Sequence, residues 1–159
     1  MTAQLPRKRN PSPTHSNPDD DLPEQDAPDQ DSPDTDHRAM ATRRRVLGST
    51  HVNRAVAATT DFDRAFQELV TASAWGRVWS RGTISFRERS MITIALLAAL
   101  GHSEELAMHI GATRNTGASA DDIAEVLLHV AIYAGAPAAN HAISIAKEIL
   151  AEEDGTPNA

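Results

Sequence analysis

Two glutamate–histidine pairs are the first residues in this sequence whose types and spacing suit chemistry. Glu105 and His109 stand four residues apart, and Glu125 and His129 repeat that spacing, with Tyr133 four residues further on. Residues four apart share one face of a helix, so each pair brings a carboxylate next to an imidazole. We expect these groups to transfer protons, because imidazole titrates near neutral pH and a carboxylate can orient its ring.

Other interpretations of the pairs stay open at this level. Each pair could be an exposed contact that only stabilises its helix. Two histidines and two carboxylates could also bind zinc. The spacing is not that of di-iron bundles, where Glu and His stand three residues apart. The presence of two pairs on consecutive predicted helices favours proton transfer over these alternatives.

A cluster of tryptophans and arginines precedes the pairs. Its members are Trp75, Arg77, Trp79, Arg81, Arg87 and Arg89. Guanidinium groups keep their charge and bind carboxylates through two parallel hydrogen bonds, so the cluster predicts a clamp for an acidic substrate. Solvated surface charge is the alternative.

Helical periodicity predicts the elements that must position these groups, and we expect an all-α fold. The predicted helices cover residues 61–73, 85–100, 103–115, 120–134 and 137 onward, with a tryptophan-rich connection over 74–82. Ser85, Ser103 and Ser119 are the expected N-caps, and Gly101 and Gly117 suit left-handed helix ends.

The helix over 120–134 is apolar on two sides. One stripe is Ile123, Val126, Leu127, Val130 and Ala134, and the other is Leu128, Ala131 and Ile132. A helix of this kind usually packs on both sides, and one small bundle can cover only one of them. We therefore expect a homo-oligomer.

The first 42 residues differ in composition from the rest. They hold seven of the nine prolines and four basic against nine acidic residues, in a chain whose net charge is −7. Such a segment buries too little apolar surface to offset its ordering entropy. We expect a disordered acidic tail over residues 1–42 and one helical domain over 43–154.

Composition also excludes several classes of protein. The predicted domain is nearly neutral, which argues against nucleic-acid binding. No apolar run is long enough to span a bilayer, and the basic start is followed by proline and acid, so we expect a cytoplasmic protein without membrane contact. The chain has no cysteine, which excludes disulfides and thiolate nucleophiles.

Several strings in the sequence resemble one known family. They are Trp75-Gly76-Arg77-Val78-Trp79-Ser80-Arg81, Arg87-Glu88-Arg89-Ser90-Met91, Glu105-Leu106-Ala107-Met108-His109, and the stretch from Glu125 through His129 and Tyr133 to Asn140. In this order, from about Arg44 to Leu150, they resemble the 4-carboxymuconolactone decarboxylase family. The resemblance implies a helical bundle of the alkylhydroperoxidase D-like type, assembled as a trimer or hexamer. It also implies decarboxylation of a small lactone acid to the β-ketoadipate enol-lactone in protocatechuate breakdown.

The implied reaction explains why we expect no cofactor and no metal. The leaving carboxylate is bonded to a lactone ring carbon next to a C=C–C=O system, which can accept the electrons released with CO2. The protein must add positive charge, a donor at the ring carbonyl and a proton. We expect Arg89, with Arg81 or Arg77, to anchor carboxylate and His109 to be the donor or acid, oriented by Glu105. Further candidates are His129, Glu125 and Tyr133 for proton chemistry, and Trp75 and Trp79 for substrate binding.

Three rival functions compete with this expectation. Alkylhydroperoxidase D-type redox chemistry needs a Cys-x-x-Cys pair ahead of the histidine, and His102 and Glu105 occupy those places here. Thiol chemistry is therefore excluded. A related decarboxylase acting on another lactone acid, and a non-catalytic assembly protein on the same fold, stay open.

Overall fold

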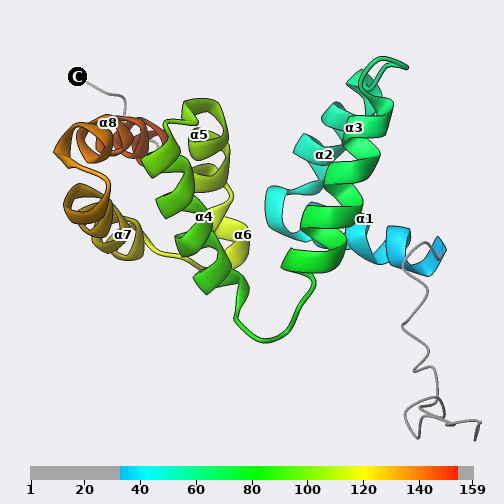
Figure 1. Ribbon diagram of the computed structural model, residues 1–159, viewed down its shortest axis with the longest axis horizontal. Helices are drawn as coiled ribbons and strands as arrows, with labels where there is room; N and C mark the ends of the chain where they lie inside the picture. Colours follow the sequence, from blue (N-terminus) through cyan, green and yellow to red (C-terminus); the bar gives the residue numbers. More distant parts are fainter. Residues whose placement is uncertain (1–32, 154–159) are drawn as a thin grey trace, which may run out of the picture. The chain divides into compact units, whose positions relative to one another are not determined.

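The computed structural model describes residues 33–153, and every regular element in this part of the chain is helical. In chain order the elements are α1 (Pro33–Leu47), α2 (Ser49–Ala58), α3 (Arg64–Val70), η1 (Thr71–Trp79), α4 (Phe86–Leu100), α5 (Ser103–Gly111), α6 (Thr113–Thr116), α7 (Ala120–Tyr133) and α8 (Ala136–Glu153). The expected all-α class is confirmed (Figure 1). None of the described helices has the length and apolar character needed to cross a membrane.

Local sequence signals account for the boundaries of the later helices. Ser85 caps α4 in a capping box with Glu88, and Ser119 caps α7 in the same way with Asp122. Each serine hydroxyl accepts a backbone N–H that the first helical turn leaves without a partner. Gly101 ends α4 at φ 77°, a left-handed conformation that glycine adopts without steric cost. These predicted boundaries are confirmed.

The segment predicted as one helix over 103–115 is two helices, α5 and α6, separated at Ala112. The predicted cap Ser103 is wrong. His102 occupies the N-cap position of α5, and the Ser103 hydroxyl instead lies 2.8 Å from Nε2 of His141 on α8. The Ser103 side chain thus contacts a helix distant in sequence and does not cap the start of α5.

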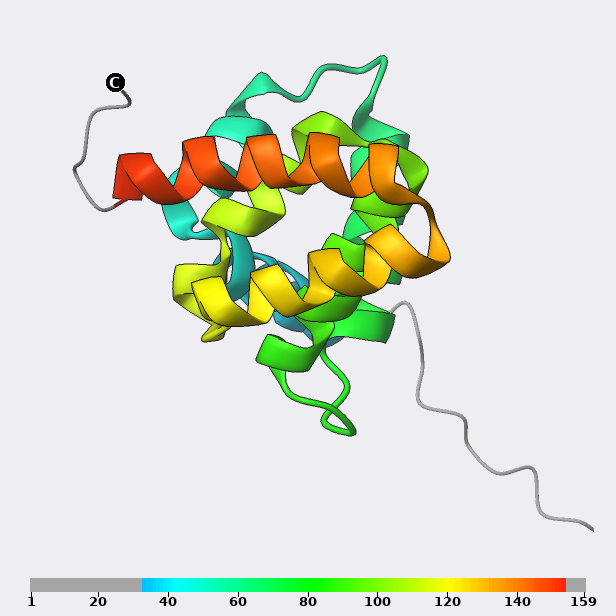
Figure 2. The ribbon, with the colours of Figure 1, turned by 90° about the vertical axis from the view of Figure 1, so that its left-hand side faces the viewer.

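The larger apolar core lies among α4, α5, α7 and α8. Ile94, Leu106, Ile110 and Ile123 are the largest side chains buried there, each at most 2% exposed. Helices α7 and α8 run side by side and are joined by a tight turn at Gly135 (Figure 2). One predicted stripe of α7 faces this core through Ile123, Val126, Leu127 and Val130.

A second core forms where α1 packs against η1, with α2 beside it. Its buried members are Ala39, Val46, Leu47, Val52, Trp75, Trp79 and Ala112. Ala39 is completely buried, and its methyl group lies 3.2 Å from where a side chain on Gly76 would begin. Small residues on both helices therefore allow the two backbones to approach closely.

Helices α1 and α2 are absent from the sequence prediction, which begins helical structure near Asp61. Helix α1 starts at Pro33, so it includes the last ten residues of the segment predicted as a tail. The reason is tertiary: α1 buries small side chains against η1 and lacks a strong apolar stripe of its own. The rest of the predicted tail, residues 1–32, lies outside the described residues.

Two apolar faces of the chain stay uncovered. On and before α3, Phe62 is fully exposed and Phe66 is 62% exposed, although the sequence predicts an amphipathic helix there. The second stripe of α7 is also in solvent, with Leu128 58% and Ile132 79% exposed. Large apolar side chains gathered at a surface are typical of contacts with another protein chain.

Candidate active site

Helix η1 places both tryptophans on its buried face. The predicted connection over 74–82 is wrong for residues 74–79, because the chain continues from α3 without a break and winds as a π-helix to Trp79. A π-helix closes its hydrogen bonds over five residues and is uncommon outside functional sites. Its buried residues are Thr71, Trp75 and Trp79, spaced by four.

His109 on α5 lies among these aromatic rings. Its imidazole is stacked with Trp75 at 6.4 Å and with Trp79 at 5.9 Å between ring centroids. The two indoles lie 5.3 Å apart, and Phe86 continues the row 6.2 Å from Trp79. The cluster brings together a predicted catalytic residue and both predicted substrate-binding tryptophans.

Burial of His109 changes its protonation. The residue is 7% exposed, and its Nδ1 atom has no hydrogen-bond partner in the described structure. Burial lowers the pKa of His109 to about 4, the charge of His51 acts in the same direction, and the charge of Glu105 opposes both. At neutral pH the ring is therefore uncharged, so it can donate one hydrogen bond and accept another.

Glu105 lies one turn before His109 but is exposed. Since Nδ1 of His109 has no partner, the expected hydrogen bond that would orient the ring is not formed there. The carboxylate acts on the imidazole through its charge, which favours the protonated form. Glu105 and His109 therefore lie close together in the structure, but Glu105 forms no hydrogen bond with Nδ1 of His109.

Arg89 is a second buried polar residue, and it lines a cavity together with Trp79 of the aromatic cluster. It is 9% exposed, and its Nη2 donates a hydrogen bond to the backbone carbonyl of Arg81 at 2.9 Å. Its Nε has no partner, and no carboxylate of the described residues forms an ion pair with it. A buried guanidinium without a counter-charge is costly, so a bound anion would stabilise it.

The side chains of Arg77 and Arg81 do not join Arg89. Both residues are exposed, and Arg81 contacts Arg89 only through its carbonyl oxygen. Arg87 is engaged elsewhere, since its Nε donates to Asp122 at 2.7 Å. Of the predicted arginine clamp, only Arg89 lies in the buried cluster.

A cavity of about 150 Å³ opens beside Arg89 and Trp79. Its other walls come from η1, α4 and the segment between them, and they are apolar apart from Thr93. Val78, Ile92 and Leu96 in these walls are more than half exposed in the single chain. The guanidinium of Arg89 therefore provides one charged anchor in a mostly apolar cavity that is open on one side.

The second predicted set lies on the exposed side of α7. Glu125, His129 and Tyr133 are all exposed, and Tyr133 is 85% exposed. Nδ1 of His129 lies 3.1 Å from the backbone carbonyl of Glu125, and the rings of His129 and Tyr133 stack at 6.3 Å. Glu125 and His129 line a separate cavity of about 320 Å³, which shares Ile92 with the Arg89 cavity.

The structure therefore separates the two glutamate–histidine pairs. The zinc alternative required both histidines and both carboxylates together, and no group of three potential ligands of this kind gathers in residues 33–153.

Three residues near the cluster were not among the predicted site residues. His51 on α2 acts on His109 through its charge, Phe86 extends the aromatic row, and the Arg45 guanidinium lies 4.6 Å above the Phe86 ring. Two of the three come from α1 and α2, which the sequence did not predict as helices. The family resemblance runs from about Arg44 and so includes His51, and that was the one available signal for this residue.

Comparison with known proteins supports a decarboxylase. Residues 64–148 match the model of the carboxymuconolactone decarboxylase family. The chain is 44% identical over 110 residues to the 4-carboxymuconolactone decarboxylase of Acinetobacter baylyi, which covers 69% of this chain and 82% of that protein. It is 35% identical over 108 residues to the nitrosuccinic acid decarboxylase of Metarhizium robertsii, which covers 68% of this chain and 76% of that protein.

Proposed function

Because the chain belongs to the carboxymuconolactone decarboxylase family and is an enzyme of the carboxy-lyase class, we propose that its substrate is 4-carboxymuconolactone. The products are CO2 and the β-ketoadipate enol-lactone, which places the reaction in protocatechuate breakdown. The higher identity to the relative named for this lactone than to the relative named for nitrosuccinic acid supports the choice.

One structural observation carries the assignment of the site. Arg89 and His109 are both buried beside Trp79, and each has a nitrogen without a hydrogen-bond partner. Arg89 lines the cavity with Trp79, and His109 stacks on the same tryptophan. Buried polar atoms are nearly always paired in folded proteins, so unpaired nitrogens on these two neighbours of Trp79 suggest partners that a ligand supplies. A lactone acid offers carboxylate and carbonyl oxygens as acceptors for these nitrogens.

The substrate itself accepts the electrons of the reaction. When the bond between the ring carbon and the carboxylate breaks, the electron pair enters the conjugated ring carbonyl and CO2 leaves. The dienolate then takes up one proton at carbon, which gives the enol-lactone. The enzyme has to stabilise the negative oxygen and deliver the proton. We therefore propose that no metal and no organic cofactor is required.

The residues around the cavity bind the substrate and stabilise the charge that the first step creates, and the proton that the dienolate carbon takes up comes from His109 or from water. Arg89 holds the carboxylate that remains on the acetate arm, because guanidinium keeps its charge when it is buried. Neutral His109 donates a hydrogen bond to the ring carbonyl as negative charge develops there, since an uncharged imidazole can act as an electrophile. Trp75 and Trp79 exclude water around the leaving carboxylate.

Glu105 has an electrostatic role in this proposal, because its charge makes protonation of His109 easier. His129, Glu125 and Tyr133 are the alternative set for proton transfer. They are exposed in the single chain, whereas His109 is buried and stacked with both tryptophans, so His109 is the preferred donor.

The direct test is to mix purified protein with 4-carboxymuconolactone labelled with ¹³C in both carboxyl groups and to follow CO2 and enol-lactone by NMR. We expect one equivalent of labelled CO2 and retention of label in the acetate arm. Nitrosuccinic acid and a lactone acid lacking the acetate arm serve as comparison substrates. Turnover of nitrosuccinic acid without turnover of the lactone would contradict the proposal. Absence of CO2 from all three would favour a non-catalytic protein.

A further inference from the structure

Arg43 on α1 is a second buried arginine without a counter-charge. It is 8% exposed, its Nη1 donates to the hydroxyl of Thr71 at 3.1 Å, and its Nη2 donates to the amide oxygen of Gln67 at 3.2 Å. Its Nε has no partner, and the described residues form no ion pair with it. All its hydrogen-bond partners are neutral, and Asp36 and Glu68, which line the same pocket, form no ion pair with it.

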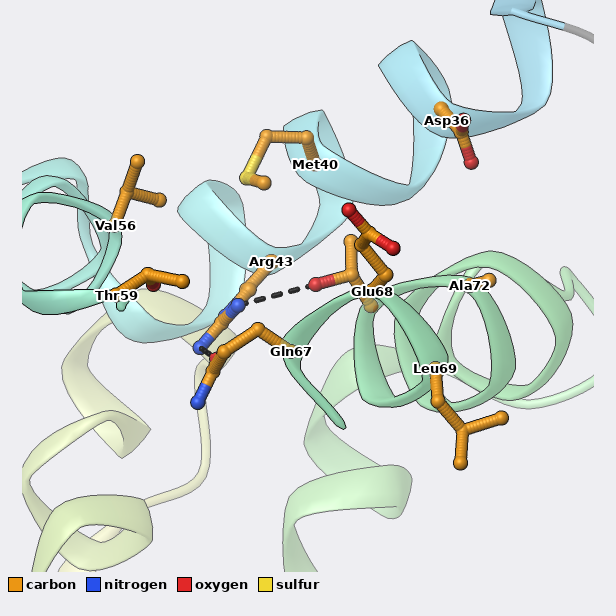
Figure 3. A pocket seen from close by; sticks show the side chains of 10 residues that line it. Asp36, Met40, Arg43, Val56, Thr59, Gln67, Glu68, Leu69 and Ala72 are labelled. Atoms are coloured by element: carbon orange, nitrogen blue, oxygen red, sulfur yellow. Dashed lines mark hydrogen bonds between the residues drawn. The ribbon is translucent and has the colours of Figure 1, made fainter. Parts of the chain in front are cut away.

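A pocket of about 450 Å³ lies next to this guanidinium, among α1, α2, α3 and η1 (Figure 3). Arg43 reaches from α1 to Gln67 on α3, and Met40, Val56 and Leu69 supply apolar walls. The volume is in the range of small-molecule sites, and one charged group among apolar side chains is typical of them. None of the residues that line this pocket lines the Arg89 cavity.

The Nε–Nη2 edge of Arg43 has unused hydrogen-bond donors of the kind that bind a carboxylate. Nε has no partner, and Nη2 carries two hydrogens, of which Gln67 accepts one. The same two nitrogens of Arg87 bind both carboxylate oxygens of Asp122 elsewhere in the chain. Asp36 and Glu68 also line the pocket, so added negative charge beyond one unit would be repelled.

We propose that this pocket binds a small organic acid with a single carboxylate, which pairs with Arg43 while its apolar body packs against Met40, Val56 and Leu69. The ligand stabilises the packing of α1 on η1, the helix that also carries both tryptophans of the Arg89 cluster. This site is separate from the proposed substrate site, so an experiment can disprove the one proposal and leave the other intact.

The test uses benzoate as the probe acid and benzamide as its neutral analogue, with the full-length protein labelled with ¹⁵N. We expect benzoate to shift one arginine Nε–H resonance in a saturable way and to raise Tm, and benzamide to do neither. The resonance should be absent in Arg43→Lys, and the shift should persist in Arg89→Lys. A shift that disappears only in Arg89→Lys, or an equal response to benzamide, overturns the proposal.

Three further variants keep the test decisive if Arg43→Lys does not fold. Val56 is 46% exposed, so Val56→Glu should fold and place a carboxylate in the pocket wall. We expect it to weaken benzoate binding at least about tenfold, while the matched Val56→Gln binds normally. Glu68→Gln should bind benzoate as tightly as the wild type or more tightly. If the wild type does not bind benzoate and Glu68→Gln does, the carboxylate of Glu68 itself pairs with the Arg43 guanidinium, and the proposal is wrong.

Discussion

His109 is the residue on which the proposed catalysis depends most, because it is the buried imidazole of the aromatic cluster. We expect His109→Ala to lower kcat about a hundredfold with little change in KM, since the hydrogen bond strengthens only as charge develops on the carbonyl. Glu105→Gln should lower kcat less, because it removes only a charge acting on the ring. Steady-state kinetics of both variants, with exposed His129→Ala as the control, measures this. Loss of kcat in His129→Ala but not in His109→Ala would mean that residues of α7, and not His109, carry out the proton chemistry.

Arg89 is expected to affect binding more than the chemical step. A carboxylate anchor serves the ground state and the transition state alike, so Arg89→Ala should raise KM by roughly 10- to 100-fold. Arg77→Ala and Arg81→Ala should change KM little, because those side chains are exposed and Arg81 supports Arg89 only through its backbone. Isothermal titration with the unlabelled product checks the result independently of turnover. Equal losses in all three variants would indicate a diffuse electrostatic effect.

His109 also predicts how stability depends on pH. Its pKa is lowered from 6.5 to about 4 in the folded protein, so between these values the unfolded chain binds a proton that the folded chain does not. The free energy of unfolding should therefore fall as pH falls from about 6.5 to about 4, by about 3 kcal/mol from this residue. Urea unfolding of His109→Gln should show a flatter profile in this window than that of the wild type. Identical slopes for wild type and His109→Gln would contradict the buried, neutral ring.

At the scale of elements, α1 decides where the folded domain begins. We propose that residues 1–30 are dispensable, and we expect their deletion to leave kcat and Tm near those of the full chain. Deletion of residues 1–42 should lower Tm by roughly 5 °C or more, because it removes completely buried Ala39 and half-buried Met40 from the contact with η1. Thermal unfolding of the two truncated proteins distinguishes them. Equal Tm values would mean that the first turns of α1 contribute nothing to the fold.

At the scale of the whole molecule, the uncovered apolar faces support assembly with further copies of the chain. The second stripe of α7 and the apolar residues of α4, with Ile92 and Leu96 more than half exposed, need a cover that one chain does not provide. We expect light scattering at micromolar concentration to give a trimer or a hexamer. Ile132→Glu should shift the mass toward the monomer, because a charge at a buried interface is costly. The control change Glu148→Gln, which alters one charge on α8, should leave the mass unchanged. A monomeric wild type would contradict this prediction.

Local sequence was sufficient for much of the helical framework. The boundaries of α4 and α7 could be predicted because capping boxes and left-handed glycines act over three or four residues. The stripe of Ile123, Val126, Leu127 and Val130 could be assigned to a core because periodicity alone defines one face of a helix. The family could be identified for a similar reason, since its motifs are contiguous strings.

Tertiary structure decided which of the candidate residues form a site. The two glutamate–histidine pairs have the same spacing, yet His109 is buried between indoles and His129 is in solvent. The difference comes from η1, whose two tryptophans stack on His109 and whose helical character local patterns did not reveal. Burial, the lowered pKa of His109 and the unpaired nitrogens of Arg43 and Arg89 all depend on segments distant in sequence. Spacing can place two groups on one helix face, but only packing determines whether that face meets water or another helix.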